Sequence, residues 1–303
     1  MKRFPLIALL IALSGCASVD IKKYTPENSL VIWAFSDIQP RNAEEREDFE
    51  VAVDDILDNG LDFTFGISGG DIVQNPGGGQ DFDAWEWYYG QLSVFKGRKF
   101  YEIAGNHDAR KIDEYLKETG KPLHYAVLYG NLLIILMSDE EDSSGSDICD
   151  RAFLWWKKLV VENRDKIIIT VTHSQLEGSG FIYNAVSYRN VTNSKRFTKV
   201  LKKHKVHIWL FGHTHMPTML GGKTRRSSSL NGTVFVNMSA IREDYMISYS
   251  ESRFIYFVPG SSKVLIRTRN HREEEFVKSE DYIVELDKPF IYNGEEPLFM
   301  PFK

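Results

Sequence analysis

The stretch "LVIWAFSDIQ", residues 30–39, is an apolar run that ends on two polar side chains. Residues 30–35 are apolar at every position, a pattern typical of a strand that is buried on both faces. Asp37 and Gln39 follow directly, and both carry oxygen atoms that can bind a metal ion. The pattern therefore predicts a buried strand that either turns a corner here or delivers two oxygen ligands to a site.

The chain repeats this pattern of a strand-length apolar run with a polar end. The further examples are "FTFGISGGD" (63–71), "KFYEIAGNHD" (99–108), "LLIILMSDE" (132–140), "KIIITVTHS" (166–174) and "VHIWLFGHTH" (206–215). Segments of helical period lie between several of them, which predicts a layered α/β fold. After residue 215 the runs become shorter and alternate, and we expect antiparallel strands of a second sheet or a sheet edge at residues 233–240, 253–259, 263–271 and 282–287.

Three helices are predicted between these strands. The first should end at Gly60, and its apolar side chains recur at helical spacing: Phe49, Ala52, Val53, Ile56 and Leu57. The second should begin at Asp150 as its N-cap and bury Phe153, Trp156, Leu159 and Val160. The third covers roughly residues 194–204.

Most of the strands end on side chains of the kind that bind metals. These are Asp37, Gln39, Asp71, Asn106, His107, Asp108, His173, His213 and His215. In an open α/β sheet, side chains at the carboxyl ends of the strands converge on one crevice. Extended backbone at residues 213–215 would place both histidines on one side, and Gly212 would allow a close approach. This suits two metal ions about 3.5–4 Å apart, with Asp71 as the candidate bridging carboxylate.

Taken in order, the blocks "SDIQ", "GGDIVQN", "GNHD", "THSQ" and "FGHTH" resemble the motifs of the calcineurin-like metallophosphoesterases. The resemblance spans residues 37–215. It implies a sandwich of two mixed sheets flanked by helices, in four layers α/β/β/α, and a site for two divalent metal ions such as Mn, Fe, Mg or Zn. The resemblance also implies the ligands, which are Asp37 and His215 for the first metal, Asn106, His173 and His213 for the second, and Asp71 as the bridge.

Two residues of the "GNHD" block receive catalytic roles from the same resemblance. His107 would bind neither metal and would face the leaving group, where it can stabilise or protonate the departing oxygen. Asp108 would help to orient His107.

Gln39 departs from the commonest family pattern, which has a histidine at this position. Its amide oxygen is as many bonds from Cα as the Nε2 atom of a histidine, so a neutral oxygen can reach the same coordination position. An oxygen ligand favours Mn, Mg or Fe over Zn, and we expect Mn-like metals. In the alternative interpretation, Gln39 only caps a turn before Pro40.

The predicted function is metal-dependent hydrolysis of small-molecule phosphoesters, either monoesters or diesters, by a metal-activated hydroxide. Arg110 and Arg189 are candidates for contacts with the substrate, although both could be ordinary surface residues. One alternative is an envelope binding protein whose metal site is inactive or partly occupied. Another is a different metallohydrolase such as an amidohydrolase, against which Asn106 argues because asparagine is a rare metal ligand elsewhere.

The first residues predict export. Lys2 and Arg3 precede the apolar stretch 4–13, which is too short to span a bilayer. "LSGC" resembles the bacterial lipobox, whose cysteine becomes acylated. We therefore expect a signal peptide at 1–15, acylated Cys16 with a tether over 16–29, and a single domain at 30–303 whose C-terminal part supplies strands of the second sheet.

This organisation places the protein in the bacterial cell envelope with a lipid anchor. Ala17, rather than an aspartate, follows Cys16 and favours the outer membrane. A cleaved signal with a chance cysteine is the alternative.

Composition sets further bounds. The chain has 303 residues, 43% of them hydrophobic, which is enough for a sizeable core. The formal net charge is -5 and no run is rich in Lys or Arg, so no nucleic-acid surface is predicted. Only two cysteines occur, and once Cys16 is acylated Cys149 has no partner for a disulfide.

Overall fold

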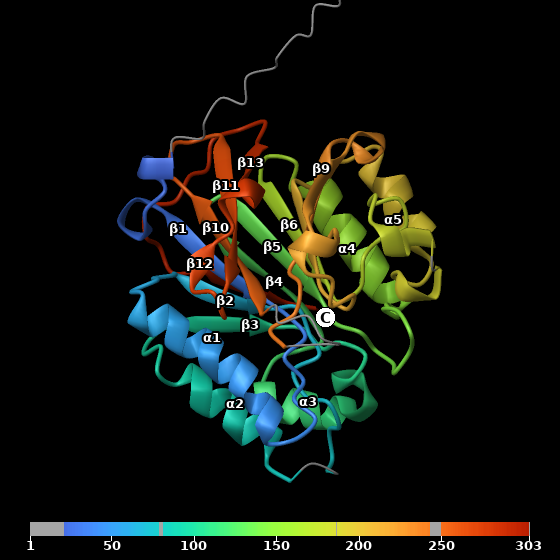
Figure 1. Cartoon of the computed structure of the whole chain (residues 1–303). Helices are drawn as coiled ribbons and strands as arrows, with labels where there is room; N and C mark the ends of the chain where they lie inside the picture. Colours follow the sequence, from blue (N-terminus) through green and yellow to red (C-terminus); the bar gives the residue numbers. More distant parts are fainter. Residues whose placement is uncertain (1–20, 79–80, 186, 243–249, 303) are drawn as a thin grey trace, which may run out of the picture.

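A computed structural model describes residues 21–78, 81–185, 187–242 and 250–302. Two mixed sheets of seven strands each form its centre (Figure 1). The first sheet has the order β12 (Glu275–Phe276), β11 (Lys263–Asn270), β10 (Glu251–Phe257), β1 (Leu30–Phe35), β2 (Phe65–Ser68) and β3 (Lys99–Glu102), and β13 (Tyr282–Glu285) also pairs with β11. The second has the order β14 (Leu298–Pro301), β4 (His124–Tyr129), β5 (Leu132–Met137), β6 (Ile167–Thr172), β7 (Ile208–Phe211), β9 (Thr233–Asn237) and β8 (Thr224–Ser227).

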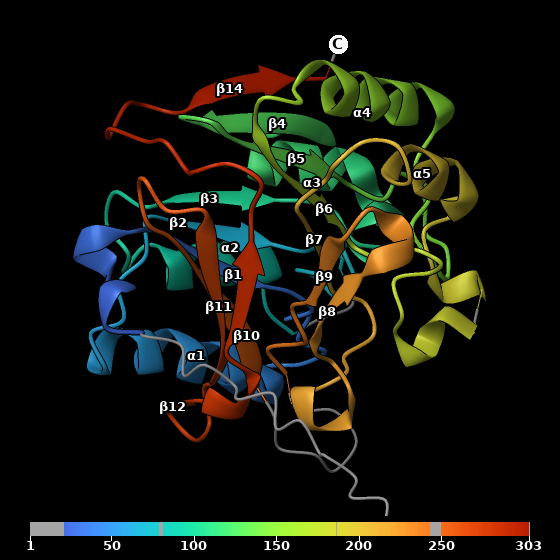
Figure 2. The same ribbon diagram turned by 90° about the horizontal axis from the view of Figure 1, so that it is seen from above.

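Helices cover the outer faces of both sheets. The first sheet packs against α1 (Glu47–Asp58), α2 (Ala84–Leu92) and α3 (Ile112–Thr119). The second sheet packs against α4 (Asp150–Glu162) and α5 (Ser194–Leu201). Figure 2 shows the two sheets from above, with α4 and α5 beside the second one. The predicted four-layer α/β/β/α sandwich is therefore confirmed.

The core between the sheets explains why the predicted strands are apolar throughout. Ile32 and Ile67 from the first sheet and Ile134 and Leu210 from the second belong to one buried cluster. The opposite face of each strand packs against helices, as Trp33 of β1 does. Strands β1, β5 and β6 are buried at every position.

The strands beyond residue 215 divide between the two sheets. As predicted, β10, β11 and β13 pair antiparallel, but they extend the sheet of β1. Strand β9 belongs to the second sheet, where it pairs with β7 in parallel rather than antiparallel orientation. The C-terminal part thus supplies β8, β9 and β14 to the second sheet, whereas β10, β11 and β13 add to one edge of the first, which is the other possibility that the sequence left open.

Two details of the predicted helices are also wrong. Leu57, expected on the buried face of α1, is 47% exposed. Cys149 rather than Asp150 is the N-cap of α4, since its Sγ accepts a hydrogen bond from the amide of Ala152 at 3.4 Å. A thiol can take the capping position because the first amides of a helix lack intrahelical acceptors.

The N-terminal predictions lie largely outside the described residues. Residues 1–15 and Cys16 are not described. Among the residues that are, no helix is both long enough and apolar enough to cross a membrane.

Candidate metal centre

The polar residues that follow the strands meet between the ends of the two sheets. In the first sheet they follow β1, β2 and β3, and in the second they follow β6 and β7. Seven of the nine are buried, and the other two are partly exposed: Asp37, Gln39, Asp71, Asn106, Asp108, His173 and His213 are buried, His107 and His215 half-buried. Residues up to 178 positions apart in the chain, Asp37 and His215, thus form one site.

Four of these residues adopt left-handed backbone, with φ of 55° at Asp37, 54° at Asp71, 64° at His213 and 47° at His215. For a residue with a side chain this costs on the order of 1–3 kcal/mol, and the conformation persists only where the surroundings fix it. Such residues concentrate at functional sites. The extended backbone predicted for residues 213–215 is wrong, and the histidines enter the site from a strained turn instead.

The close approach predicted at Gly212 is confirmed. A Cβ atom at this position would lie 2.0 Å from Oγ of Ser36 and 2.3 Å from Oδ2 of Asp37. The backbone amide of His213 donates to the carboxylate of Asp37 at 2.9 Å. Only glycine allows the turn after β7 to lie against the end of β1 in this way.

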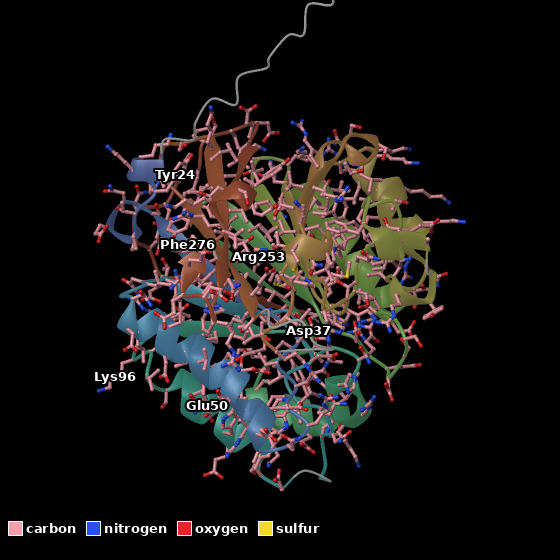
Figure 3. All side chains as sticks on the ribbon, viewed as in Figure 1. Tyr24, Asp37, Glu50, Lys96, Arg253 and Phe276 are labelled. Carbon is pink, nitrogen blue, oxygen red and sulfur yellow. The ribbon has the colours of Figure 1, made fainter. Side chains whose placement is uncertain are left out.

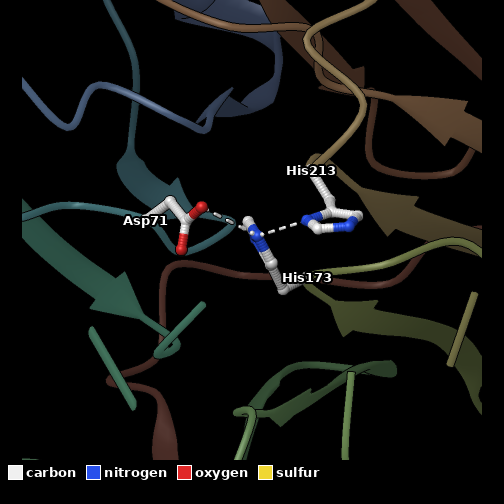
Figure 4. Close-up of side chains that lie close together, drawn as sticks. All are labelled: Asp71, His173 and His213. Atoms are coloured by element: carbon white, nitrogen blue, oxygen red, sulfur yellow. Dashed lines mark hydrogen bonds and ion pairs between the residues drawn. The ribbon is translucent and has the colours of Figure 1, made fainter. Parts of the chain in front are cut away.

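One group of possible metal ligands consists of Asp71, His173 and His213 (Figure 4). One ligand atom of each lies within 4.8 Å of the others. Nε2 of His173 is 3.2 Å from Oδ2 of Asp71 and 3.2 Å from Nδ1 of His213. The other ring nitrogen of His173 bonds to the carbonyl of Gly69 at 2.8 Å, which aims Nε2 into the group.

A second group consists of Asp37, Asp71 and His215. Nε2 of His215 is 3.1 Å from Oδ1 of Asp37 and 3.1 Å from the amide nitrogen of Gln39. Asp71 belongs to both groups, so one carboxylate lies between two sets of ligands.

Two buried amide oxygens support a cation at this place. Oε1 of Gln39 and Oδ1 of Asn106 have no hydrogen-bond partner among the described residues. An unpaired buried polar atom costs about 1–3 kcal/mol, and a bound cation would satisfy both. The set of carboxylates, imidazoles and amide oxygens fits divalent metal ions.

The charges of the site are strongly coupled. Burial disfavours the charged forms of Asp71 and His173, but each stabilises the charge of the other. The pKa of Asp71 consequently lies below its usual value, and the pKa of His173 lies well above. Burial and the neighbouring His173 lower the pKa of His213 to about 4. Asp71 is therefore ionised and His213 neutral at pH 7, as metal binding requires, and a cation would replace the proton of His173.

His107 lies at the edge of the same site. Its backbone amide donates to Oδ1 of Asp71 at 2.8 Å, and its ring Nδ1 bonds to the carbonyl of Gln74 at 3.0 Å. These contacts hold His107 beside the carboxylate of Asp71, and the residue lines the cavity over the site.

Asp108 contacts backbone amides rather than the ring of His107. Its fully buried carboxylate accepts hydrogen bonds from the amides of Ile72 at 3.0 Å, Val73 at 2.9 Å and Gly105 at 2.9 Å. The carbonyl of Gln74 makes the ring contact that we expected of Asp108. Asp108 therefore fixes the turns that carry Asp71 and Asn106, and it acts on the site through them.

A cavity of about 920 Å³ opens over these side chains. Four arginines line it, namely Arg41, Arg110, Arg189 and Arg242. The sequence predicted Arg110 and Arg189 as substrate contacts, and the structure places both at the cavity. Carboxylates offset part of this charge. Glu45 pairs with Arg41 at 2.6 Å and lies 3.7 Å from Arg242, and Asp142, which also lines the cavity, pairs with Arg110 at 3.1 Å.

Sequence reasoning missed the other two arginines. Arg41 follows the first block after Pro40, a signal that could have been used. Arg242 follows no block, and only folding brings its Nη1 to the carbonyl of Gln39, at 3.1 Å. The sequence reasoning also missed Asp139, a fully buried carboxyl after β5. Burial raises the pKa of this carboxyl well above the usual value.

The fold and these two ligand groups define a metal-dependent phosphoesterase. The family model for the calcineurin-like phosphoesterases matches residues 30–217, which is more than half of the chain. The chain therefore belongs to the calcineurin-like phosphoesterase family and is a hydrolase of the metallophosphoesterase class. No sequence among the curated proteins matches it.

Solved structures share the fold at low sequence identity. A purple acid phosphatase from yellow lupin (Lupinus luteus) seeds is 13% identical with a TM-score of 0.59, and the match covers 86% of this chain and 54% of that one. This chain thus spans about half the length of the lupin protein. GAP50, the anchor in the inner membrane complex of Plasmodium, is 12% identical with a TM-score of 0.62, and the match covers 88% of this chain and 91% of that one.

Proposed function

We propose that the chain hydrolyses small-molecule phosphoesters at a centre of two divalent metal ions. The observation that carries this proposal is the position of Asp71 in both ligand groups, with each group completed by imidazoles from the second sheet. Asp37, Gln39 and His215 would hold the first ion, and Asn106, His173 and His213 the second. The bound ions would activate a water molecule and offset the charge on the phosphoryl oxygens.

The donor set also bears on the choice of metal. The group of Asp37, Asp71 and His215 offers two carboxylates and one imidazole, and Gln39 would add an amide oxygen, so this group is richer in oxygen than the group of Asp71, His173 and His213. Oxygen donors suit Mn, Mg or Fe better than Zn. We therefore propose Mn-like occupancy of the first position.

The other residues of the cavity would handle the substrate. Nδ1 of His107 donates to the carbonyl of Gln74, so the imidazolium form of the ring would be the one that gives a proton from Nε2 to the departing oxygen. Arg110 donates from Nη1 to the same carbonyl at 3.0 Å, which keeps its positive charge close to His107. Arg110 and Arg189 would bind anionic parts of the substrate.

We also propose that the mature chain is a lipid-anchored protein of the bacterial cell envelope, acylated at Cys16, with the outer membrane as the favoured location. The described chain begins at Ile21 and enters β1 at Leu30, whereas the site follows the other end of β1. A tether before residue 30 would consequently leave the cavity open to soluble substrates. Labelling of the full chain with a radioactive fatty acid, and its loss in Cys16→Ala, tests this.

Hydrolysis of p-nitrophenyl phosphate and bis(p-nitrophenyl) phosphate tests the enzymatic proposal. We expect turnover by the full chain that requires Mn²⁺, Mg²⁺ or Zn²⁺ and falls strongly in His107→Ala. His204→Ala is the matched control, because this histidine lies outside the cavity and its loss should leave the rate unchanged. The ratio of the two rates distinguishes a monoesterase from a diesterase. Absence of turnover with every metal, while phosphate still binds, would favour the envelope binding protein instead.

A further inference from the structure

The segment 216–222 forms one wall of the cavity directly after the last predicted metal ligand. Met216, Pro217 and Leu220 line the cavity, and Tyr188 lines it from another segment. Leu220 is 46% exposed and Tyr188 is 65% exposed, so apolar surface remains open to solvent at the mouth. The arginines of the same cavity are cationic, whereas this part of it offers almost no charge.

A buried ion pair on β10 forms hydrogen bonds with residues of this segment. Glu251 and Arg253 are each 1% exposed and lie 3.6 Å apart. Oε2 of Glu251 accepts hydrogen bonds from the amide of Thr218 at 2.9 Å and from its hydroxyl at 2.7 Å. Nη2 of Arg253 donates to the hydroxyl of Thr218 at 3.2 Å and to the carbonyl of Gly222 at 2.9 Å. Figure 3 labels Arg253 on β10 and Asp37 beyond the end of β1.

The contacts within the wall make it a compact unit. Residues Thr218–Leu220 form a short 3₁₀ turn, and the amides of Leu220 and Gly222 both donate to the carbonyl of Pro217 at 3.0 Å. A Cβ atom at Gly222 would lie 1.7 Å from the carbonyl oxygen of Met216, so only glycine closes this turn. Thr218 therefore connects the charged pair to the position of Leu220.

Other contacts fix the neighbouring ligand His215. Nδ2 of Asn237 donates to the hydroxyl of Thr214 at 3.0 Å, and Oγ of Ser239 donates to the carbonyl of Met216 at 3.2 Å. The Glu251–Arg253 pair is thus attached to the wall, and separate hydrogen bonds hold the ligand segment. Both charged residues lie beyond the match to the family model, which ends at residue 217.

We propose that segment 216–222 is the specificity wall of the enzyme, that it selects phosphoesters with an apolar or aromatic leaving group, and that Glu251 and Arg253 are its positioning residues. This inference rests on the proposed function, because the phosphoryl group must sit at the metal centre for the leaving group to reach the wall. The metals and arginines would bind the phosphoryl end, and Leu220 and Tyr188 would cover the other end. Burial of apolar leaving-group surface against them supplies the selectivity.

Binding of methylphosphonate and benzylphosphonate to the Mn²⁺-loaded full chain tests the proposal by calorimetry. Neither compound has a leaving group, so the ratio of their dissociation constants measures contact with the wall rather than chemistry. We expect benzylphosphonate to bind about tenfold more tightly. Leu220→Ala should reduce this ratio by about threefold.

Two control variants show whether a change in the ratio comes from the wall or from any loss of a similar side chain. Leu57→Ala shortens a leucine of similar exposure, 47% against 46%, that lies outside the wall and does not line the cavity, and it should leave the ratio unchanged. Thr218→Val, which removes the hydroxyl between the charged pair and the wall, should reduce the ratio as Leu220→Ala does. Thr233→Val also removes a buried hydroxyl, one that bonds to the carbonyl of Leu230 at 2.9 Å, and should not change the ratio.

The outcomes distinguish this inference from the function on which it rests. Equal affinity for the two phosphonates, or an equal loss in Leu57→Ala and Leu220→Ala, would overturn the specificity wall while hydrolysis continued. Absence of binding by both phosphonates, together with absence of hydrolysis, would overturn the proposed function and this inference with it.

Discussion

Gln39→Met should leave the metal-free protein at least about as stable as the wild type. In the metal-free state the change removes one buried unpaired oxygen, a gain of about 1–3 kcal/mol, and one hydrogen bond between the amide and His215. That hydrogen bond, at 3.1 Å, contributes about 0.5–1.5 kcal/mol. Because the two terms oppose each other, the free energy of unfolding should change by between about -0.5 and about +2.5 kcal/mol, so that the variant is at least about as stable as the wild type.

Metal binding should respond differently to the same change. A ligand at a hundredfold excess over its dissociation constant stabilises the folded state by about 2.7 kcal/mol. If loss of the amide oxygen weakens the first position tenfold, about 1.4 kcal/mol of this stabilisation disappears. The variant thus distinguishes the two interpretations of Gln39, as a metal ligand or as the cap of a turn.

Urea denaturation of the full chain, with a chelator and then with Mn²⁺, measures both quantities. Gln175→Met is the matched control, because the amide of Gln175 is buried without a partner among the described residues but does not line the cavity. Its Mn²⁺-dependent stabilisation should equal that of the wild type. The same Mn²⁺ increment in Gln39→Met as in the wild type would refute the ligand role.

Three more predictions concern other parts of the molecule. His107→Ala should lower kcat by about 10²–10⁴-fold without loss of bound metal, and metal analysis beside the rate measurement checks this. Asp108→Ala should reduce the free energy of unfolding in urea by about 3–5 kcal/mol, because three buried amides lose their acceptor. His207 accepts at Nδ1 from the amide of Ile168, and burial lowers its pKa to about 4. Since the unfolded chain then binds the proton more readily, stability should fall below pH 6.5, by about 2 kcal/mol at pH 5, and His207→Gln should abolish this part of the pH dependence.

The strand ends explain how much of the site the sequence could predict. A strand buried on both faces is apolar throughout, so the polar residue that follows it is conspicuous, as Asp37 is after Phe35. Because parallel strands end at the same edge, such residues converge whatever the details of the loops. Asp37 and Asp71 could be placed together on this basis alone, because β1 and β2 are parallel neighbours. His173 follows β6 of the other sheet, so its approach to Asp71 depends on how the two sheets pack.

Residues whose positions depend on tertiary contacts could not be predicted. Arg242 reaches the cavity only because its guanidinium bonds to the carbonyl of Gln39, 203 positions earlier in the chain. Nothing in the sequence distinguishes Glu251 and Arg253 from other residues of a strand. Their position becomes clear only when β10 is paired with β1. The left-handed backbone at His213 was missed for the same reason, since it is imposed by the contact of that turn with Asp37.

The helix errors have a local origin. Leu57 continues the apolar spacing of α1, but it lies at the edge of the face that packs against the sheet. Its side chain is 47% exposed, whereas that of Ile56 in the same turn is 1% exposed. Periodicity predicts which face of a helix is apolar, whereas the packing against the sheet decides how wide a part of that face is buried.

The most direct test of the central claim is a titration of the metal-free chain with Mn²⁺, with the rate of phosphoester hydrolysis as the readout. At a protein concentration far above the dissociation constants, a centre bridged by Asp71 predicts a rate that rises to a plateau at two equivalents. Asp71→Asn should show no turnover at any Mn²⁺ concentration up to the same ratio. A plateau at one equivalent, or full turnover in Asp71→Asn, would contradict the two-metal account.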